Sequence, residues 1–172
     1  MRYNKIEPCE CINGEGWGVT VWLQGCPHHC KGCFNPETWD FDGGEYLTGA
    51  KEQEIYQLIA QPHIARCSFS GGEPLMEENL YHLNYMLCTI KSNWRKKKIW
   101  IWTGYTWDEI QERRTHYPDK LMVTFKYIDY LVTGPFIEEE KDLTLKWRGS
   151  RNQEVIDIQE TRKQGKKVLY VE

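Results

Sequence analysis

The sequence predicts an α/β fold with an open, partial (β/α) barrel and a mostly parallel sheet. Short apolar stretches rich in β-branched and aromatic residues alternate with longer stretches of helical periodicity, which is typical of parallel sheets with right-handed crossovers. At 172 residues the chain is too short for a closed eight-unit barrel, which needs about 250 residues. We therefore expect a truncated barrel in a single domain over residues 1–172.

The expected strands are short runs of apolar and β-branched residues bounded by turn residues. Four of them, at residues 17–24, 64–69, 98–103 and 128–133, are expected to form the parallel sheet, and residues 155–158 and 168–171 are expected to add two more strands. Residues 1–16 are expected to be mostly irregular. Residues 117–127 are ambiguous from their sequence.

Helices are expected between these strands. Residues 48–61 repeat apolar residues at helical spacing, and a second helix is expected from Pro74, in its first turn, to about Ser92. A third helix is expected from Trp107 to about His116. Thr106 would cap it in a capping box, because a glutamate follows three residues later.

A loop with three cysteines follows the first predicted strand directly. Cys26, Cys30 and Cys33 form a C-x3-C-x2-C pattern. A four-iron cluster normally takes four cysteines, so three ligands would leave one iron open for another ligand, as catalytic zinc sites also keep one position open. Ligand sites of parallel α/β proteins gather at the carboxyl ends of strands, where this loop is expected. The loop therefore predicts a metal ligand set.

Zinc binding is the alternative for this loop. Zinc sites usually pair one C-x2-4-C unit with a second pair downstream, and no second C-x2-C occurs here. His28 and His29 could complete a zinc set, but adjacent residues project in different directions. Both are expected to be solvated loop residues, with a role in supporting the metal ligands as a lesser alternative for one of them. Cys9 and Cys11 could form a second metal half-site, or they could be two small buried apolar residues.

A second pattern follows the predicted strand at residues 64–69. Gly71 and Gly72 allow the backbone to approach a ligand closely. Glu73 offers an acceptor for an ammonium group. Taken alone, this sequence predicts only a turn, but after a cysteine loop of this kind it indicates a cofactor site.

Composition limits the classes of partner and compartment. The formal net charge of −3 gives no reason to expect nucleic-acid binding. No apolar run has the length of a membrane span, and the first residues do not resemble a signal peptide. We therefore expect a cytoplasmic protein. Thiols stay reduced there, so seven cysteines favour metal or redox chemistry over disulfides.

Together, the cysteine loop and the Gly-Gly-Glu turn resemble the radical S-adenosylmethionine superfamily. The chain also resembles one of its families, the activating proteins of anaerobic ribonucleoside-triphosphate reductase, over residues 13–153. The blocks that carry this resemblance are residues 26–35 with Thr38 and Trp39, residues 68–75, residues 100–105 and residues 147–153. The resemblance implies that the truncated barrel is of the radical S-adenosylmethionine type.

The resemblance further implies an oxidoreductase that acts as a glycyl-radical-enzyme activase. Cys26, Cys30 and Cys33 would hold one [4Fe-4S] cluster, and S-adenosylmethionine would bind its open iron and be cleaved reductively to a 5′-deoxyadenosyl radical. That radical would generate a glycyl radical on the reductase, with reduced flavodoxin or a similar protein as electron donor. The implied cofactor-binding residues are Gly32, Cys33, Phe34, Gly71, Gly72 and Glu73. No further catalytic side chain is implied.

The substrate in this hypothesis is a protein segment, so the site should open on one side. Trp100, Trp102, Tyr105 and residues 148–153 could border this mouth, with core packing as the alternative for the two tryptophans. Arg148 could pair with a carboxylate of the cofactor or of the partner, or it could be a lone exposed residue. Three alternatives remain open from the sequence. They are a small radical S-adenosylmethionine enzyme acting on a small molecule, such as a deazaguanine-forming synthase, another glycyl-radical activase, and a non-catalytic zinc- or cluster-binding interaction module.

Overall fold

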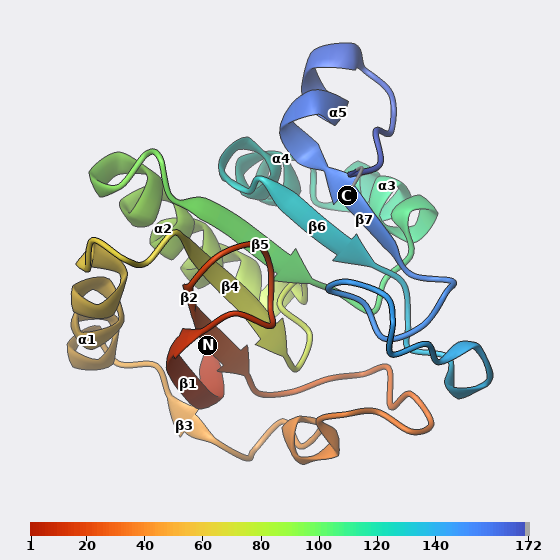
Figure 1. Cartoon of the computed structure of the whole chain (residues 1–172), viewed down its shortest axis with the longest axis horizontal. Helices are drawn as coiled ribbons and strands as arrows, with labels where there is room; N and C mark the ends of the chain where they lie inside the picture. The colour runs from red at the N-terminus through yellow and green to blue at the C-terminus, as the bar shows by residue number, and fades with distance from the viewer. Residues whose placement is uncertain (171–172) are drawn as a thin grey trace.

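A computed structural model describes residues 1–170 of the chain. Within these residues seven strands form one sheet in the order β3-β1-β2-β4-β5-β6-β7 (Figure 1). The strands are β1 (Arg2–Glu10), β2 (Gly18–Leu23), β3 (Glu45–Tyr46), β4 (Arg66–Gly71), β5 (Lys98–Trp102), β6 (Tyr130–Thr133) and β7 (Glu154–Asp157).

The central strands β2, β4, β5 and β6 are parallel, whereas β1, β3 and β7 join the sheet antiparallel. The prediction of an α/β fold is confirmed. The sheet is open and mixed, because only its central part is parallel, and its description as a partial barrel stays a prediction.

The helices occupy most of the stretches expected from periodicity. They are α1 (Gly49–Ala60), α2 (Glu77–Asn93), α3 (Trp107–His116), α4 (Pro118–Tyr127) and α5 (Ile158–Gln164). The capping box of α3 is present, with Thr106 and Glu109 bonding each other's backbone. The ambiguous stretch is helix α4. No helix within residues 1–170 is both long and apolar enough to cross a membrane.

Three predictions about the elements were wrong. Residues 1–16 are not mostly irregular, because β1 pairs with β2 on one side and β3 on the other. Backbone hydrogen bonds to both neighbours hold this polar strand in the sheet. Its side chains therefore need not alternate between apolar and polar, which is the pattern that would have predicted a strand. Pro74 lies in the turn after β4, and α2 begins only at Glu77. The last expected strand reduces to a single bridge between Ile156 and Leu169, and Val171 lies outside the described residues.

One face of the sheet is covered by helices, which lie behind the strands in Figure 1. Alternate residues of a strand point to opposite faces, and on β4 the residues Cys67 and Phe69 point to this side and are fully buried. They pack with apolar residues of the helices, such as Ile55, Leu83 and Leu87. This helix-covered face contains the main core.

The opposite face is covered by loops instead, and it carries large aromatic and polar side chains. Trp100 is fully buried there, with Trp102 and Trp147 beside it. Arg66, also fully buried, pairs with Glu10 at 2.8 Å. This loop-covered face therefore combines a small aromatic core with a charged group, and the candidate site forms along its edge.

Candidate functional site

The cysteine loop, residues 25–34, begins where β2 ends. The residues that follow it in the chain hold it in place through backbone hydrogen bonds. Gly25 donates its N–H to the carbonyl of Thr38 at 2.8 Å, and Cys26 donates to Trp39 at 3.2 Å. Gly25 has a φ of 90°, a conformation that favours glycine. The loop lies at the carboxyl ends of the parallel strands, together with the blue loop that follows β6 (Figure 1).

The three thiols of this loop are neighbours. Cys26, Cys30 and Cys33 are half-buried and free, and Cys30 interacts electrostatically with each of the other two. Burial raises the pKa of Cys26 to about 11 and also raises the pKa of Cys30. Binding to a metal would therefore have to displace the thiol protons, as metal–thiolate bonds do.

The donor set fits an iron–sulfur cluster better than a single ion. In the part of the chain that the structure describes, no three His, Cys, Asp or Glu side chains converge as ligands of one metal ion. In a four-iron cluster each cysteine binds a different iron, so the thiols surround a larger group and need not converge. His29 lies exposed against the ring of Trp39.

The other cysteines lie away from this loop. Cys9 and Cys11 lie near the amino-terminal end of β2, because Glu10 pairs with Gly18. Both are exposed, so the expectation that they are buried apolar residues was wrong. Cys67 points to the helix-covered face, and Cys88 lies in α2 beside Tyr127. Of the seven cysteines, only Cys26, Cys30 and Cys33 therefore lie in this loop.

The structure places the Gly-Gly-Glu turn directly against the cysteine loop. Gly72 donates its N–H to the carbonyl of Leu23, and Glu73 donates to Gly25, both at 2.8 Å. A Cβ on Gly72 would lie 2.4 Å from the carbonyl oxygen of Gly25, so only glycine fits at this position. The two sequence patterns thus meet at the ends of the adjacent strands β2 and β4.

The carboxylate of Glu73 is fully buried and saturated with hydrogen bonds. It accepts from the backbone N–H groups of Leu75 and Gly104 and from the Thr103 hydroxyl, each at 2.8 Å. The ring of His28 lies at the same distance and is mostly buried, so the expectation that His28 is solvated was wrong. An ammonium group could bind this carboxylate only if one of these donors gave way, so the ammonium-binding role expected for Glu73 stays a prediction.

The loop after β6 packs against the cysteine loop from the other side. The backbone N–H of Phe136 donates to the Cys30 sulfur and lowers its pKa against the effect of burial. The rings of Phe34 and Phe136 lie 5.0 Å apart between centroids. Lys31 pairs with Glu138 at 3.0 Å. The sequence did not identify Phe136, because a single aromatic residue after a strand has no distinguishing pattern.

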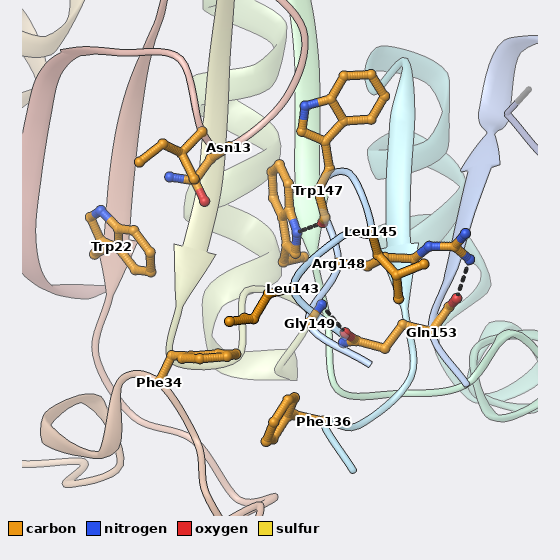
Figure 2. A pocket seen from close by; sticks show the side chains of 12 residues that line it. Asn13, Trp22, Phe34, Phe136, Leu143, Leu145, Trp147, Arg148, Gly149 and Gln153 are labelled. Carbon is orange, nitrogen blue, oxygen red and sulfur yellow. Dashed lines mark hydrogen bonds between the residues drawn. The ribbon is translucent and has the colours of Figure 1, made fainter. Parts of the chain in front are cut away.

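A cavity of about 380 Å³ opens beside the cysteine loop (Figure 2). Its walls are mainly apolar, with Trp22 and Phe34 on one side and Leu145 and Trp147 on the other. The residues that line it are Ile12, Asn13, Trp22, Phe34, Trp102, Phe136, Leu143, Leu145, Trp147, Arg148, Gly149 and Gln153.

Some of the residues expected at the mouth line this cavity, and the mouth itself stays a prediction. Trp102, Arg148, Gly149 and Gln153 line the cavity. Trp100 does not, because it is fully buried in the aromatic core, which agrees with the core-packing alternative. Tyr105 does not line it either, and packs against the ring of His28 at 4.6 Å.

One wall of the cavity is the segment at residues 137–153, which its own polar groups hold together. Gln153 accepts from the N–H of Gly149 at 2.8 Å, and its carbonyl accepts from Arg148 at 2.9 Å (Figure 2). Trp147 has a φ of 60°, which is uncommon for an aromatic residue, and its carbonyl accepts from the indole N–H of Trp102 at 2.7 Å. Arg148 therefore has a partner within the segment.

Comparison with known proteins places most of the chain in one family. A family model described as a 4Fe-4S single cluster domain matches residues 12–156. An anaerobic ribonucleoside-triphosphate reductase-activating protein of Vibrio cholerae serotype O1 is 37% identical over 155 residues, which is 89% of this chain and 96% of the relative. The chain belongs to this family.

Further members of the family support the assignment. The protein of the same name from Escherichia coli K12 is 36% identical over 157 residues, covering 90% of this chain and 97% of the relative. That of Enterobacteria phage T4 is 32% identical over 155 residues, covering 89% and 92%. The resemblance inferred from the motifs is thereby confirmed, as is the iron–sulfur character of the family.

Proposed function

We propose that this protein activates an anaerobic ribonucleoside-triphosphate reductase by generating a glycyl radical on it. The single observation that carries the proposal is the contact between the three-cysteine loop and the Gly-Gly-Glu turn, made by the Glu73 N–H and the Gly25 carbonyl at 2.8 Å. Membership in the activating-protein family supports the identity of the partner. The electron donor would be reduced flavodoxin or a similar protein, in the cytoplasm.

Cys26, Cys30 and Cys33 would hold one [4Fe-4S] cluster and leave its fourth iron to S-adenosylmethionine. When bound, these cofactors would supply a one-electron cleavage of the sulfonium to methionine and a 5′-deoxyadenosyl radical, which takes a hydrogen atom from a glycine of the reductase. The chain itself would position the cluster, because the loop is braced by the turn after β4 and by the Phe136 backbone.

Residues around the loop would position S-adenosylmethionine. Gly71, Gly72 and Glu73 would hold its methionine end through the backbone of the turn that they form, and the buried Glu73 carboxylate would shape this turn. The segment Gly32, Cys33 and Phe34 would border the adenosyl part. Phe34 lines the cavity and is about half exposed, so it is accessible to a bound group.

The cavity beside the loop would admit the glycine-bearing segment of the partner. Its walls are mainly apolar, and the exposed side chains of Ile12, Phe34 and Leu143 surround it. A protein segment could bind in this open cavity without any unfolding of the activase. This cavity would also keep water away from the radical, since water exclusion prevents side reactions.

The proposal can be tested with the anaerobically reconstituted protein. Incubation with the reductase, S-adenosylmethionine and a reductant should produce a glycyl radical signal in electron paramagnetic resonance, together with 5′-deoxyadenosine. Omitting the reductase should remove the glycyl signal but keep some reductive cleavage. A protein that binds only colourless zinc, or that forms 5′-deoxyadenosine without ever yielding the glycyl signal, would contradict the proposal.

A further inference from the structure

His28 links the cysteine loop to a buried carboxylate. It lies in the loop between two of the proposed cluster ligands, and its Nε2 is 2.8 Å from the Glu73 carboxylate. The side chain of His28 is only 17% exposed and that of Glu73 is fully buried. The His28 ring also rests with its edge on Tyr105 and covers Gly104, where a Cβ would lie 2.4 Å from the ring. This close fit leaves the ring little freedom.

The Glu73 carboxylate joins three chain segments at one point. Its other partners come from its own turn, at Leu75, and from the end of β5, at Thr103 and Gly104. A buried carboxylate is tolerated only when protein donors replace its water. His28 is the one of these donors that comes from the cysteine loop.

We propose that His28 and Glu73 are positioning residues of the cluster site, which tie the cysteine loop to the ends of β4 and β5. The inference rests on the proposed function, because it takes the three loop cysteines as the cluster ligands. The hydrogen bond holds the first half of the loop, between Cys26 and Cys30, in place before any cofactor binds. The side chain of His29, the next residue, is exposed and lies against the ring of Trp39.

Hydrogen exchange in the full-length apo-protein tests this role. His28→Gln keeps an N–H near the position of Nε2, whereas His28→Leu fills similar space without a donor. Loss of a hydrogen bond to a charged group should make the amides of residues 26–34 exchange about tenfold faster in His28→Leu. The exchange should stay close to that of the wild type in His28→Gln. His29→Asn is the matched control in the same loop, and it should leave exchange unchanged because Asn tolerates a positive φ.

Two results would overturn the proposal. Equal acceleration in His28→Gln and His28→Leu would mean that ring packing holds the loop instead of the hydrogen bond. Unchanged exchange in His28→Leu would mean that neither the His28 ring nor its hydrogen bond to Glu73 is needed to order the loop. These measurements use no cluster and no reductase, so their failure would leave the proposed function standing, and absence of a glycyl radical would leave the measured loop order standing.

A measurement on the wild type covers the case in which His28→Leu does not fold. In the ¹⁵N-labelled apo-protein, the His28 ring should carry a proton on Nε2 that exchanges slowly with water, since that proton donates to Glu73. A ring protonated only on Nδ1, or an Nε2 proton in fast exchange, would contradict the hydrogen bond. In the reconstituted protein, His28→Leu should also lose iron to a chelator about tenfold faster than His28→Gln.

Discussion

The two faces of the sheet are built from the same strands but follow different rules. On β4, Cys67 and Phe69 pack under helices in an aliphatic core, whereas Arg66 and Ser68 point to the loops and bond each other at 2.7 Å. The helix-covered face depends on shape and apolar area. The loop-covered face keeps polar groups, large rings and a cavity, and the proposed site lies at its edge. Substitutions on the two faces should therefore have different kinds of effect.

The largest difference is expected between two cysteines. Cys30→Ala removes a proposed cluster ligand and should abolish iron binding and glycyl-radical formation, with little change in the unfolding of the apo-protein. Cys67→Ala removes a fully buried thiol from the helix-covered face. It should cost about 1 kcal/mol of stability and leave iron content unchanged. Iron analysis and urea unfolding of both variants check this, and loss of iron in Cys67→Ala alone would reverse the assignment.

Neighbouring residues of β4 give the next largest contrast. Phe69→Ala opens a cavity in the main core, where Phe69 is fully buried, and should cost about 3–5 kcal/mol. Ser70→Ala, on the other face, removes one buried hydroxyl and opens no large cavity, so it should cost at most about 1 kcal/mol. Urea unfolding of the apo-protein measures both. Similar losses in the two variants would show that the faces do not differ as described.

A smaller, pH-dependent effect is expected at Glu10. Burial favours its neutral form, but hydrogen bonds from Thr20 and Arg66 outweigh burial, so the pKa of Glu10 is lowered from its usual 4.5. A lowered pKa contributes stability that is present above about pH 4.5 and is lost as the pH falls through the folded value. Glu10→Gln should cost about 1–3 kcal/mol at pH 7.

The comparison of pH values is the control for this prediction. The difference in unfolding free energy between wild type and Glu10→Gln should shrink when both are measured near pH 3, because the wild-type carboxyl is then increasingly protonated. A difference that stays constant from pH 7 to pH 3 would show that the charge of Glu10 does not stabilise the buried Arg66.

The smallest effect is expected at Trp102. Trp102→Phe keeps most of the ring but removes the hydrogen bond to the Trp147 carbonyl, which should cost about 1 kcal/mol. Hydrogen exchange should rise locally in residues 143–153 and stay unchanged in the helices. Faster exchange throughout the chain would instead place Trp102 in the main core.

Patterns that depend on neighbours in the chain were predicted well. The capping box at Thr106 and Glu109 was identified from spacing alone, because its bonds form within one turn of helix. The four parallel strands were found near their actual positions, since each is a short apolar run between turns. The polar strand β1 was missed because pairing with distant residues stabilises it. The helix α5 was missed because its seven residues show little periodicity.

For the site, the sequence determined the chemistry of the donors. Three cysteines in one loop and two glycines before a glutamate are local facts, and the rule that parallel strands end at one edge places them together. Only the tertiary structure decided how the Glu73 carboxylate is used, because its partners, His28, Thr103 and Gly104, come from segments that no local pattern connects. The burial of Glu73 and the choice of its hydrogen-bond partners depend on the whole fold. Through these partners Glu73 connects the cysteine loop to the end of β5.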